Sequence, residues 1–131
     1  MSIKTILIVL GEPNSTFSEV LLKYFNSKFS KRNKSRIILI GNKKLFYKQM
    51  RKLKYNFSLN EINAIKEYSA NFINIINIDY KFKNTFSRIT VNSADYIEKC
   101  FDLSLKIIGK KKTQFLINGP VSKKHFLKKK F

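Results

Sequence analysis

The chain has 131 residues, of which 44% are hydrophobic, so it is long enough for one domain with a substantial core and too short for two comfortable ones. Its 27 Lys and Arg residues against 8 Asp and Glu residues give a net charge of +19, but 12 Phe and 6 Tyr exclude the apolar-poor composition of a disordered polycation. No apolar run approaches a membrane span and no cleavable leader opens the sequence, so we expect a cytoplasmic protein with no membrane partner.

The first predicted elements are a strand and a helix. Ile6–Leu10 is a continuous apolar run bounded by Gly11, which predicts a strand covered on both faces in a parallel sheet. A helix should begin at Thr16, whose hydroxyl would cap it in a capping box with Glu19, and run towards Phe29. The side chains expected to be buried on this helix are Val20, Leu21, Tyr24 and Phe25.

A strand followed by a helix is predicted a second time. Arg36–Ile40 predicts a second parallel strand that ends in a turn at Gly41-Asn42. Lys43–Lys54 predicts a helix with lysines on its solvated side and an apolar side made of Leu45, Phe46, Met50 and Leu53. The segment that follows is less regular, and its expected elements are a short helix over Glu61–Tyr68, a strand over Phe72–Ile78 and a surface loop over Lys81–Ser87.

A longer helix is predicted over Ser93–Ile108. Ser93 would cap it, Asp95 would lie in its first turn, and Gly109 would end it. Its apolar stripe should consist of Ile97, Phe101, Leu105 and Ile108. Cys100, the only cysteine, cannot form an intramolecular disulfide, and its apolar surroundings indicate a buried packing residue in a reducing compartment.

The last elements complete the prediction of the fold. Phe115–Ile117 predicts a final buried strand, and Ser122 would cap a helix that begins at Lys123. Because apolar strands alternate with helices, we predict an α/β fold in which a partial parallel-sheet layer has flanking helices. Residues 1–131 would form a single domain, and because the sequence stops at Phe131 within the last predicted helix, we expect a truncated product.

Two turns are the candidates for binding. In parallel α/β sheets ligands bind at the carboxyl ends of strands, where the amino-termini of helices favour anions. Each turn pairs a conformationally permissive glycine with a rigid proline, and Lys123 would add a cation to bind a phosphate or carboxylate. Such turns also occur where the chain only connects a strand to a helix, and Lys123 could simply be the first residue of a helix. The candidate substrate-cleft residues are Gly11, Glu12, Pro13, Asn118, Gly119, Pro120 and Lys123.

These turns carry a resemblance to a known family. Gly11-Glu12-Pro13, with Glu19 six residues further on, resembles the amino-terminal signature Gly-Asp/Glu-Pro-Ala-Gly-Ile-Gly-Pro-Glu of the 4-hydroxythreonine-4-phosphate dehydrogenases of pyridoxal phosphate biosynthesis. Asn118-Gly119-Pro120-Val121-Ser122-Lys123 is similar to that family's Thr-Gly-Pro-Ile/Val-Ser/His/Asn-Lys motif. The sequence departs from the family in the segment 14–18, which lacks the family's two glycines, and at Asn118, where the family has Thr.

The resemblance implies a fold and an activity. It implies a fold like that of isocitrate and isopropylmalate dehydrogenases, and an NAD-dependent oxidation of a phosphorylated small molecule, 4-phosphohydroxy-threonine, at a divalent metal in a homodimer. It covers the chain as the first two-fifths or so of a member. The family's Gly-His-Thr-Glu segment and metal-binding histidines would lie beyond Phe131, so we expect no catalytic or metal-ligating residue in this chain, no cofactor bound by it alone, and no activity without the rest of the enzyme.

Two other functions stay open. A small basic protein could bind nucleic acid through phosphates, but the excess of Lys, Asn, Ile, Phe and Tyr is also what an AT-rich genome imposes, and the lysines are spread along the sequence. A degenerate paralogue could persist as the partner subunit of a full-length dehydrogenase. His125, the only histidine, stands among lysines and is interpreted as a surface residue. The sequence contains no phosphate-binding loop, dinucleotide fingerprint or nucleophile set.

Overall fold

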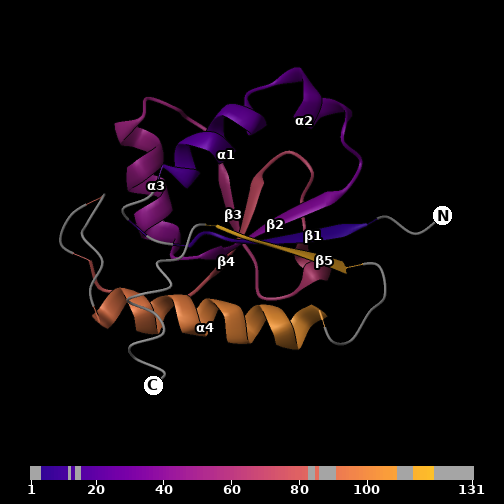
Figure 1. Ribbon diagram of the computed structural model, residues 1–131. Helices are drawn as coiled ribbons and strands as arrows, with labels where there is room; N and C mark the ends of the chain where they lie inside the picture. The colour runs from indigo at the N-terminus through magenta and orange to yellow at the C-terminus, as the bar shows by residue number, and fades with distance from the viewer. Residues whose placement is uncertain are drawn as a thin grey trace.

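A computed structural model of the chain describes residues 4–11, 13, 16–82, 85, 91–108 and 114–119, and within these ranges it contains one parallel sheet between two helical layers (Figure 1). The strands are β1 (Thr5–Val9), β2 (Arg36–Gly41), β3 (Leu59–Glu61), β4 (Ile73–Asn77) and β5 (Gln114–Asn118). Their order across the sheet is β3-β4-β2-β1-β5, and every neighbouring pair is parallel. The predicted α/β class with a parallel sheet is confirmed.

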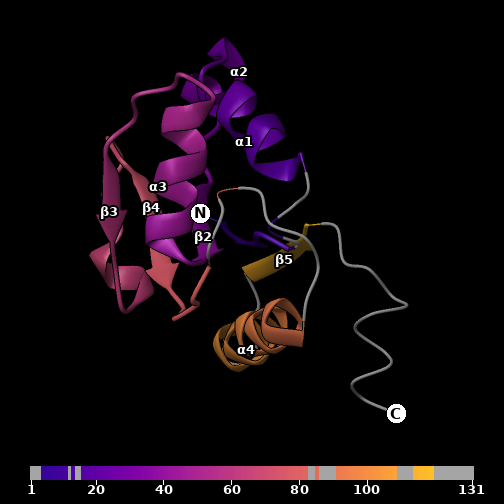
Figure 2. The ribbon, with the colours of Figure 1, turned by 90° about the vertical axis from the view of Figure 1, so that its left-hand side faces the viewer.

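Helices cover the two faces of this sheet. Helices α1 (Phe17–Phe25), α2 (Lys28–Arg32) and α3 (Lys43–Lys52) lie on one face, and α4 (Val91–Ile108) lies alone on the other (Figures 1 and 2). The alternation of side chains along each strand supplies both faces with apolar residues. Along β1, Leu7 and Val9 belong to the cluster beneath α4, whereas Ile8 belongs to the cluster beneath α1 and α3.

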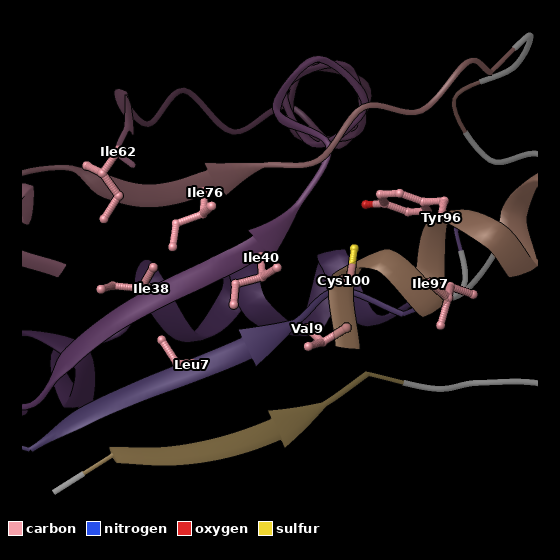
Figure 3. Close-up of a cluster of buried hydrophobic side chains, with 9 residues drawn as sticks. All are labelled: Leu7, Val9, Ile38, Ile40, Ile62, Ile76, Tyr96, Ile97 and Cys100. Carbon is pink, nitrogen blue, oxygen red and sulfur yellow. The ribbon is translucent and has the colours of Figure 1, made fainter. Parts of the chain in front are cut away.

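Two hydrophobic clusters hold the layers together. The cluster between the sheet and α4 is drawn in Figure 3 and consists of Leu7, Val9, Ile38, Ile40, Ile62, Ile76, Tyr96, Ile97 and Cys100. The cluster on the other face consists of Ile8, Leu21, Leu22, Leu39, Phe46, Met50, Ile73 and Ile75. Full burial of one such aliphatic side chain contributes about 1.5–3 kcal/mol, so the two clusters are the main source of stability.

The first helix is shorter than the sequence predicted. It ends at Phe25, and the separate helix α2 follows, because the Ser27 hydroxyl donates to the carbonyl of Tyr24 at 2.6 Å and diverts the chain. The predicted burial of Val20 is wrong, since this residue is 56% exposed. The predicted capping box is also wrong: the Thr16 side chain makes no capping hydrogen bond, and Glu19 pairs with Lys23 one turn along, at 3.5 Å.

The long helix α4 begins two residues earlier than predicted. Ser93 therefore lies inside the helix and is buried instead of capping it, and Asp95 lies beyond the first turn. The expected stripe is wrong at Leu105, which is 56% exposed. Ser104 occupies the buried position instead, and its hydroxyl donates to the carbonyl of Cys100 at 2.6 Å, which lets a polar residue face the sheet.

The middle segment also differs from the prediction. In place of a helix over Glu61–Tyr68 the chain forms β3 and a short 3₁₀ turn at Ile65–Glu67. A carboxylate oxygen of Glu67 accepts the backbone N–H groups of Asn63 and Ala64, both at 2.8 Å, and these bonds favour a tight turn over a helix. Most of the predicted loop Lys81–Ser87 lies outside the described residues, as do Gly109 and the predicted helix from Lys123 with Ser122 and His125.

The last strand is an edge strand of the sheet. Phe115 and Ile117 are each 48% exposed, so the prediction of a buried strand is wrong for these two side chains. Leu116 points to the opposite face and packs against the cluster beneath α4. None of the helices in the described part of the chain is long and apolar enough to cross a bilayer.

Candidate functional site

Both glycine turns lie at the carboxyl edge of the sheet. Because β1 pairs in parallel with β5, Val9 is in register with Asn118, and the chain leaves the two strands at Gly11 and Gly119, side by side. The N–H of Gly119 donates to the carbonyl of Val9 at 2.7 Å, so the contact between the strands continues into the second turn. The sheet therefore brings together two segments that are more than a hundred residues apart in sequence.

Glycine is required at each of these turns for a different reason. Gly11 has a φ of 79°, a backbone conformation that residues with a side chain rarely adopt. Gly119 is buried, and a Cβ atom there would lie 2.4 Å from the carbonyl oxygen of Leu10 and 2.6 Å from the ring of Phe17. At Gly119 the second turn is thus packed against Leu10 and Phe17 without space for a methyl group.

Tyr96 stabilises the neighbouring strand end. Its hydroxyl accepts the backbone N–H of Asn42 at 2.7 Å, directly after β2, and its ring stacks on Tyr80 with 4.4 Å between centroids. A Cβ atom on Gly41 would lie 2.7 Å from this hydroxyl, so the glycine leaves room for the tyrosine. Figure 3 shows Tyr96 and Cys100 reaching from α4 towards the end of β2 marked by Ile40.

Two asparagines fix the start of α3 at the same edge. The Asn42 side chain accepts the N–H of Leu45 at 2.9 Å, which is an N-cap bond, and donates to the carbonyl of Ile78 at 2.9 Å. The Asn77 side chain accepts the N–H of Lys43, also at 2.9 Å. The ends of β2 and β4 and the start of α3 therefore form one hydrogen-bonded unit.

A small cavity lies behind the first turn. It has a volume of about 10 Å³ and is lined by Leu10, Gly11, Pro13, Ser18, Leu45, Phe46, Gln49 and Tyr96. The amide nitrogen of Gln49 donates to the carbonyls of Pro13 and Thr85, both at 2.9 Å, and so ties this turn to a segment far along the chain. The buried hydroxyl of Ser18 has no hydrogen-bond partner in the described part of the protein.

Burial keeps the titratable groups near the site neutral. Desolvation raises the pKa of the Cys100 thiol from 9.0 to about 12, and it raises the pKa of Tyr96 well above 10.0. Burial therefore favours the neutral form of both side chains. Cys100 is therefore the buried packing residue that the sequence predicted.

The structure places only some of the predicted site residues. Gly11, Pro13 and Gly119 are buried at the carboxyl edge, and Asn118 is exposed beside them, whereas Glu12, Pro120 and Lys123 lie outside the described residues. Within the described ranges, no three His, Cys, Asp or Glu side chains come together as metal ligands. What the described residues provide is a rigid edge of backbone amides and side-chain amides.

The sequence was compared with those of known proteins. No family model matches the chain. A 4-hydroxythreonine-4-phosphate dehydrogenase of Sulfurihydrogenibium sp. (strain YO3AOP1) is 31% identical over 127 residues, which are 95% of this chain and 38% of that protein. The resemblance predicted from the two turns is confirmed. The chain spans about two-fifths of the length of this 4-hydroxythreonine-4-phosphate dehydrogenase.

Solved structures of 4-hydroxythreonine-4-phosphate dehydrogenases share the fold. The enzyme from Burkholderia phymatum superimposes with a TM-score of 0.78 at 14% identity, over 97% of this chain and 39% of the other. The enzyme from Klebsiella pneumoniae gives a TM-score of 0.73 at 15% identity, again over 97% and 39%. The parallel sheet with its flanking helices is thus the arrangement found in part of these dehydrogenases.

Sequence reasoning missed several residues that shape this dehydrogenase-like edge. The position of Asn42 between a strand and a helix is a recognisable N-cap signal, and Gln49 is a polar residue on the apolar side of a helix. No local signal marks Tyr96, because its partner Asn42 is 54 residues away. Contacts of this kind depend on the packing of α4 against the sheet.

Proposed function

We propose that the chain is the amino-terminal part of an NAD-dependent 4-hydroxythreonine-4-phosphate dehydrogenase of pyridoxal phosphate biosynthesis, and that it has no activity alone. The observation that supports this proposal is that the two family-like turns follow paired strands at the carboxyl edge of the sheet, where the N–H of Gly119 donates to the carbonyl of Val9 in β1 at 2.7 Å. Ligands of parallel α/β sheets bind at this edge. The single buried cysteine fits a cytoplasmic enzyme.

In this proposal the chain supplies the sheet scaffold and one wall of the substrate cleft. The segment that follows Gly119 would face the phosphate of 4-phosphohydroxy-threonine, with the amides beside Pro120 as donors and Lys123 as the cation. NAD would accept the hydride in the assembled enzyme. We give the described residues no part in binding the family's divalent metal, and we assign the metal and the homodimer contacts to the rest of the enzyme.

A chimaeric enzyme tests this role. The matched region of the Sulfurihydrogenibium enzyme would be replaced by this chain and NADH formation measured with 4-phosphohydroxy-threonine. We expect an active chimaera in which Lys123→Ala raises KM by about tenfold or more, the loss of one charge-assisted phosphate contact. Lys106→Ala, at the exposed end of α4, is the matched control and should leave KM unchanged. Equal KM values for the two variants would refute the assignment of Lys123.

One observation supports a second candidate function, the binding of a polyanion. Helix α2 carries three basic residues and no acid, and α3 carries five basic residues and no acid, whereas α4 on the other face carries two lysines and three acids. Codon bias alone would enrich both faces in lysine. A gel-shift assay with single-stranded RNA tests this candidate, since phosphate contacts would give retardation that falls steeply with salt. Absence of retardation at low salt rules it out.

A further inference from the structure

We propose that a cavity at the amino edge of the sheet binds a nucleotide, with the base against its aromatic rings and the phosphate at Lys31. The cavity has a volume of about 450 Å³, which falls within the range of roughly 300–1,000 Å³ of small-molecule sites. Its walls are the end of α1, the helix α2 with the segment that leads into β2, and the segments that precede β3 and β4. We call it the amino-edge pocket, and its characteristic side chains are those of Phe25, Lys31, Phe57, Tyr68, Asn71 and Phe72.

The amino-edge pocket lies at the opposite end of the strands from the two glycine turns. It is lined by Ile37, near the start of β2, and by Ile73, the first residue of β4. Because β2 is six residues long, roughly 16 Å of strand separates its two ends. The inference therefore goes beyond the proposed function and does not rest on it.

One wall of the pocket is held in place by a buried asparagine. Asn74 is 1% exposed, and its side-chain amide donates to the carbonyls of Ser69 and Phe72, at 2.8 and 3.1 Å. Its side-chain oxygen accepts the N–H of Ser69 at 2.9 Å and the side-chain amide of Asn60 at 2.8 Å. The full hydrogen-bonding capacity of this side chain is thus used to fix the neighbouring strand and the loop in which Phe72 lies.

The wall formed by α2 and the residues after it is fixed in a similar way. The Ser30 hydroxyl donates to the carbonyl of Phe25 at 2.9 Å. The Asn33 side chain accepts the N–H of Ser35 at 2.9 Å and donates to the hydroxyl of Tyr24 at 2.8 Å. Both walls are therefore formed before a ligand arrives, which lowers the entropic cost of binding.

The lining combines aromatic rings, free polar groups and one cation. Phe72 is 45% exposed, so a large part of its ring is open to a ligand. Within the described part of the chain, the side chains of Lys31, Ser58 and Asn71 have no hydrogen-bond or ion-pair partner. Among the described residues that line the pocket there is no carboxylate. The pocket therefore suits a ligand that has a flat ring, a polar edge and a negative charge.

A nucleotide uses all three kinds of group. Its base stacks on an aromatic ring, the edge of the base pairs with amide and hydroxyl side chains, and the phosphate pairs with Lys31. A fatty acid would leave the polar side chains unpaired, inorganic phosphate would leave the rings uncovered, and a neutral sugar would make no use of the lysine. Helix α2 carries three basic residues and no acid, so the local electrostatic field also favours a phosphate.

Titration calorimetry with the full 131-residue chain tests the site. The probes are AMP and UMP as free nucleotides and a uridylate decamer as an RNA strand, with adenosine as the phosphate-free comparison. We expect adenosine to bind about tenfold more weakly than AMP, because it lacks the charge-assisted contact. Phe72→Ala removes a stacking surface and Asn71→Asp adds a negative charge to the lining, so each should weaken nucleotide binding by about tenfold.

Matched controls separate the pocket from the general positive charge of the chain. Phe29→Ala removes a 64% exposed ring of α2 and Lys28→Ala removes a cation of the same helix, and neither residue lines the pocket. Both variants should keep the affinity within about twofold, whereas Lys31→Ala should lower it by about tenfold.

The outcomes are distinguishable. Absence of nucleotide binding by a chain that circular dichroism shows to be folded overturns the proposal, and so does binding that Phe72→Ala and Asn71→Asp leave unchanged. Binding of the free nucleotides identifies a small-molecule site, whereas binding of the decamer alone, lost in Phe72→Ala, assigns the nucleotide to an RNA strand. In the chimaeric dehydrogenase Phe72→Ala should leave KM for 4-phosphohydroxy-threonine unchanged, so a failure of this inference does not affect the test of the proposed function.

Discussion

Replacing Tyr96 by phenylalanine tests the link between α4 and the carboxyl edge. The hydroxyl removed accepts the N–H of Asn42 at 2.7 Å, and Tyr96 is 3% exposed, so water cannot readily replace it. The substitution leaves the ring and its stacking on Tyr80 in place but leaves a buried N–H without a partner. Leaving such a group unsatisfied costs about 1–3 kcal/mol, a large share of the roughly 5–15 kcal/mol by which a domain is stable.

The assay is urea unfolding followed by circular dichroism. We expect the midpoint of Tyr96→Phe to fall by about 1 M with an unchanged slope. Tyr80→Phe is the matched control: its hydroxyl makes no hydrogen bond within the described residues, and its effect should stay within about 0.5 kcal/mol. Equal midpoints for the two variants would refute the view that α4 stabilises the end of β2 through this bond.

Four further substitutions probe the same edge. Gly119→Ala should destabilise by about 1–3 kcal/mol, because the new methyl group meets the carbonyl of Leu10 at 2.4 Å; a neutral effect in urea unfolding would contradict this close approach. Asn42→Ala should lower the free energy of unfolding by about 1 kcal/mol, because it removes the N-cap of α3. A variant with unchanged helical content and unchanged stability would contradict the capping role. Ser18→Ala should leave the free energy of unfolding unchanged or raise it, since the hydroxyl lacks a hydrogen-bond partner among the described residues. A clear loss of stability would contradict this. The free energy of unfolding should decrease above about pH 9, by up to about 1.4 kcal/mol per pH unit, because the thiol of Cys100 ionises in the unfolded chain while its pKa in the folded chain is about 12. In Cys100→Ala the pH profile between about 9 and 10 should be flatter, and an identical slope would exclude the thiol as its cause.

The sequence predicted the elements of the fold better than their surfaces. Apolar runs bounded by glycine correctly marked β1 and β2, and the period of Lys43–Lys54 correctly marked α3 with its buried side. One error concerns an element, since β3 and a 3₁₀ turn replace the helix expected over Glu61–Tyr68. Others concern exposure, since Val20 and Leu105 fit a helical stripe but lie more than half exposed. Periodicity reports which side of a helix is apolar, whereas burial depends on whether another element covers that side.

The sequence by itself determined most of the strands and helices, with β3 and α2 as exceptions, and it located the two glycine turns, because both are properties of neighbouring residues. Only the tertiary structure decided that β5 is an edge strand with Phe115 and Ile117 half exposed, since strand order is set by pairing between distant segments. The same holds for the bond between Tyr96 and Asn42, which exists only because α4 packs across the end of β2. The local residue pattern determines the secondary-structure elements, whereas the candidate site depends on how these elements pack against one another.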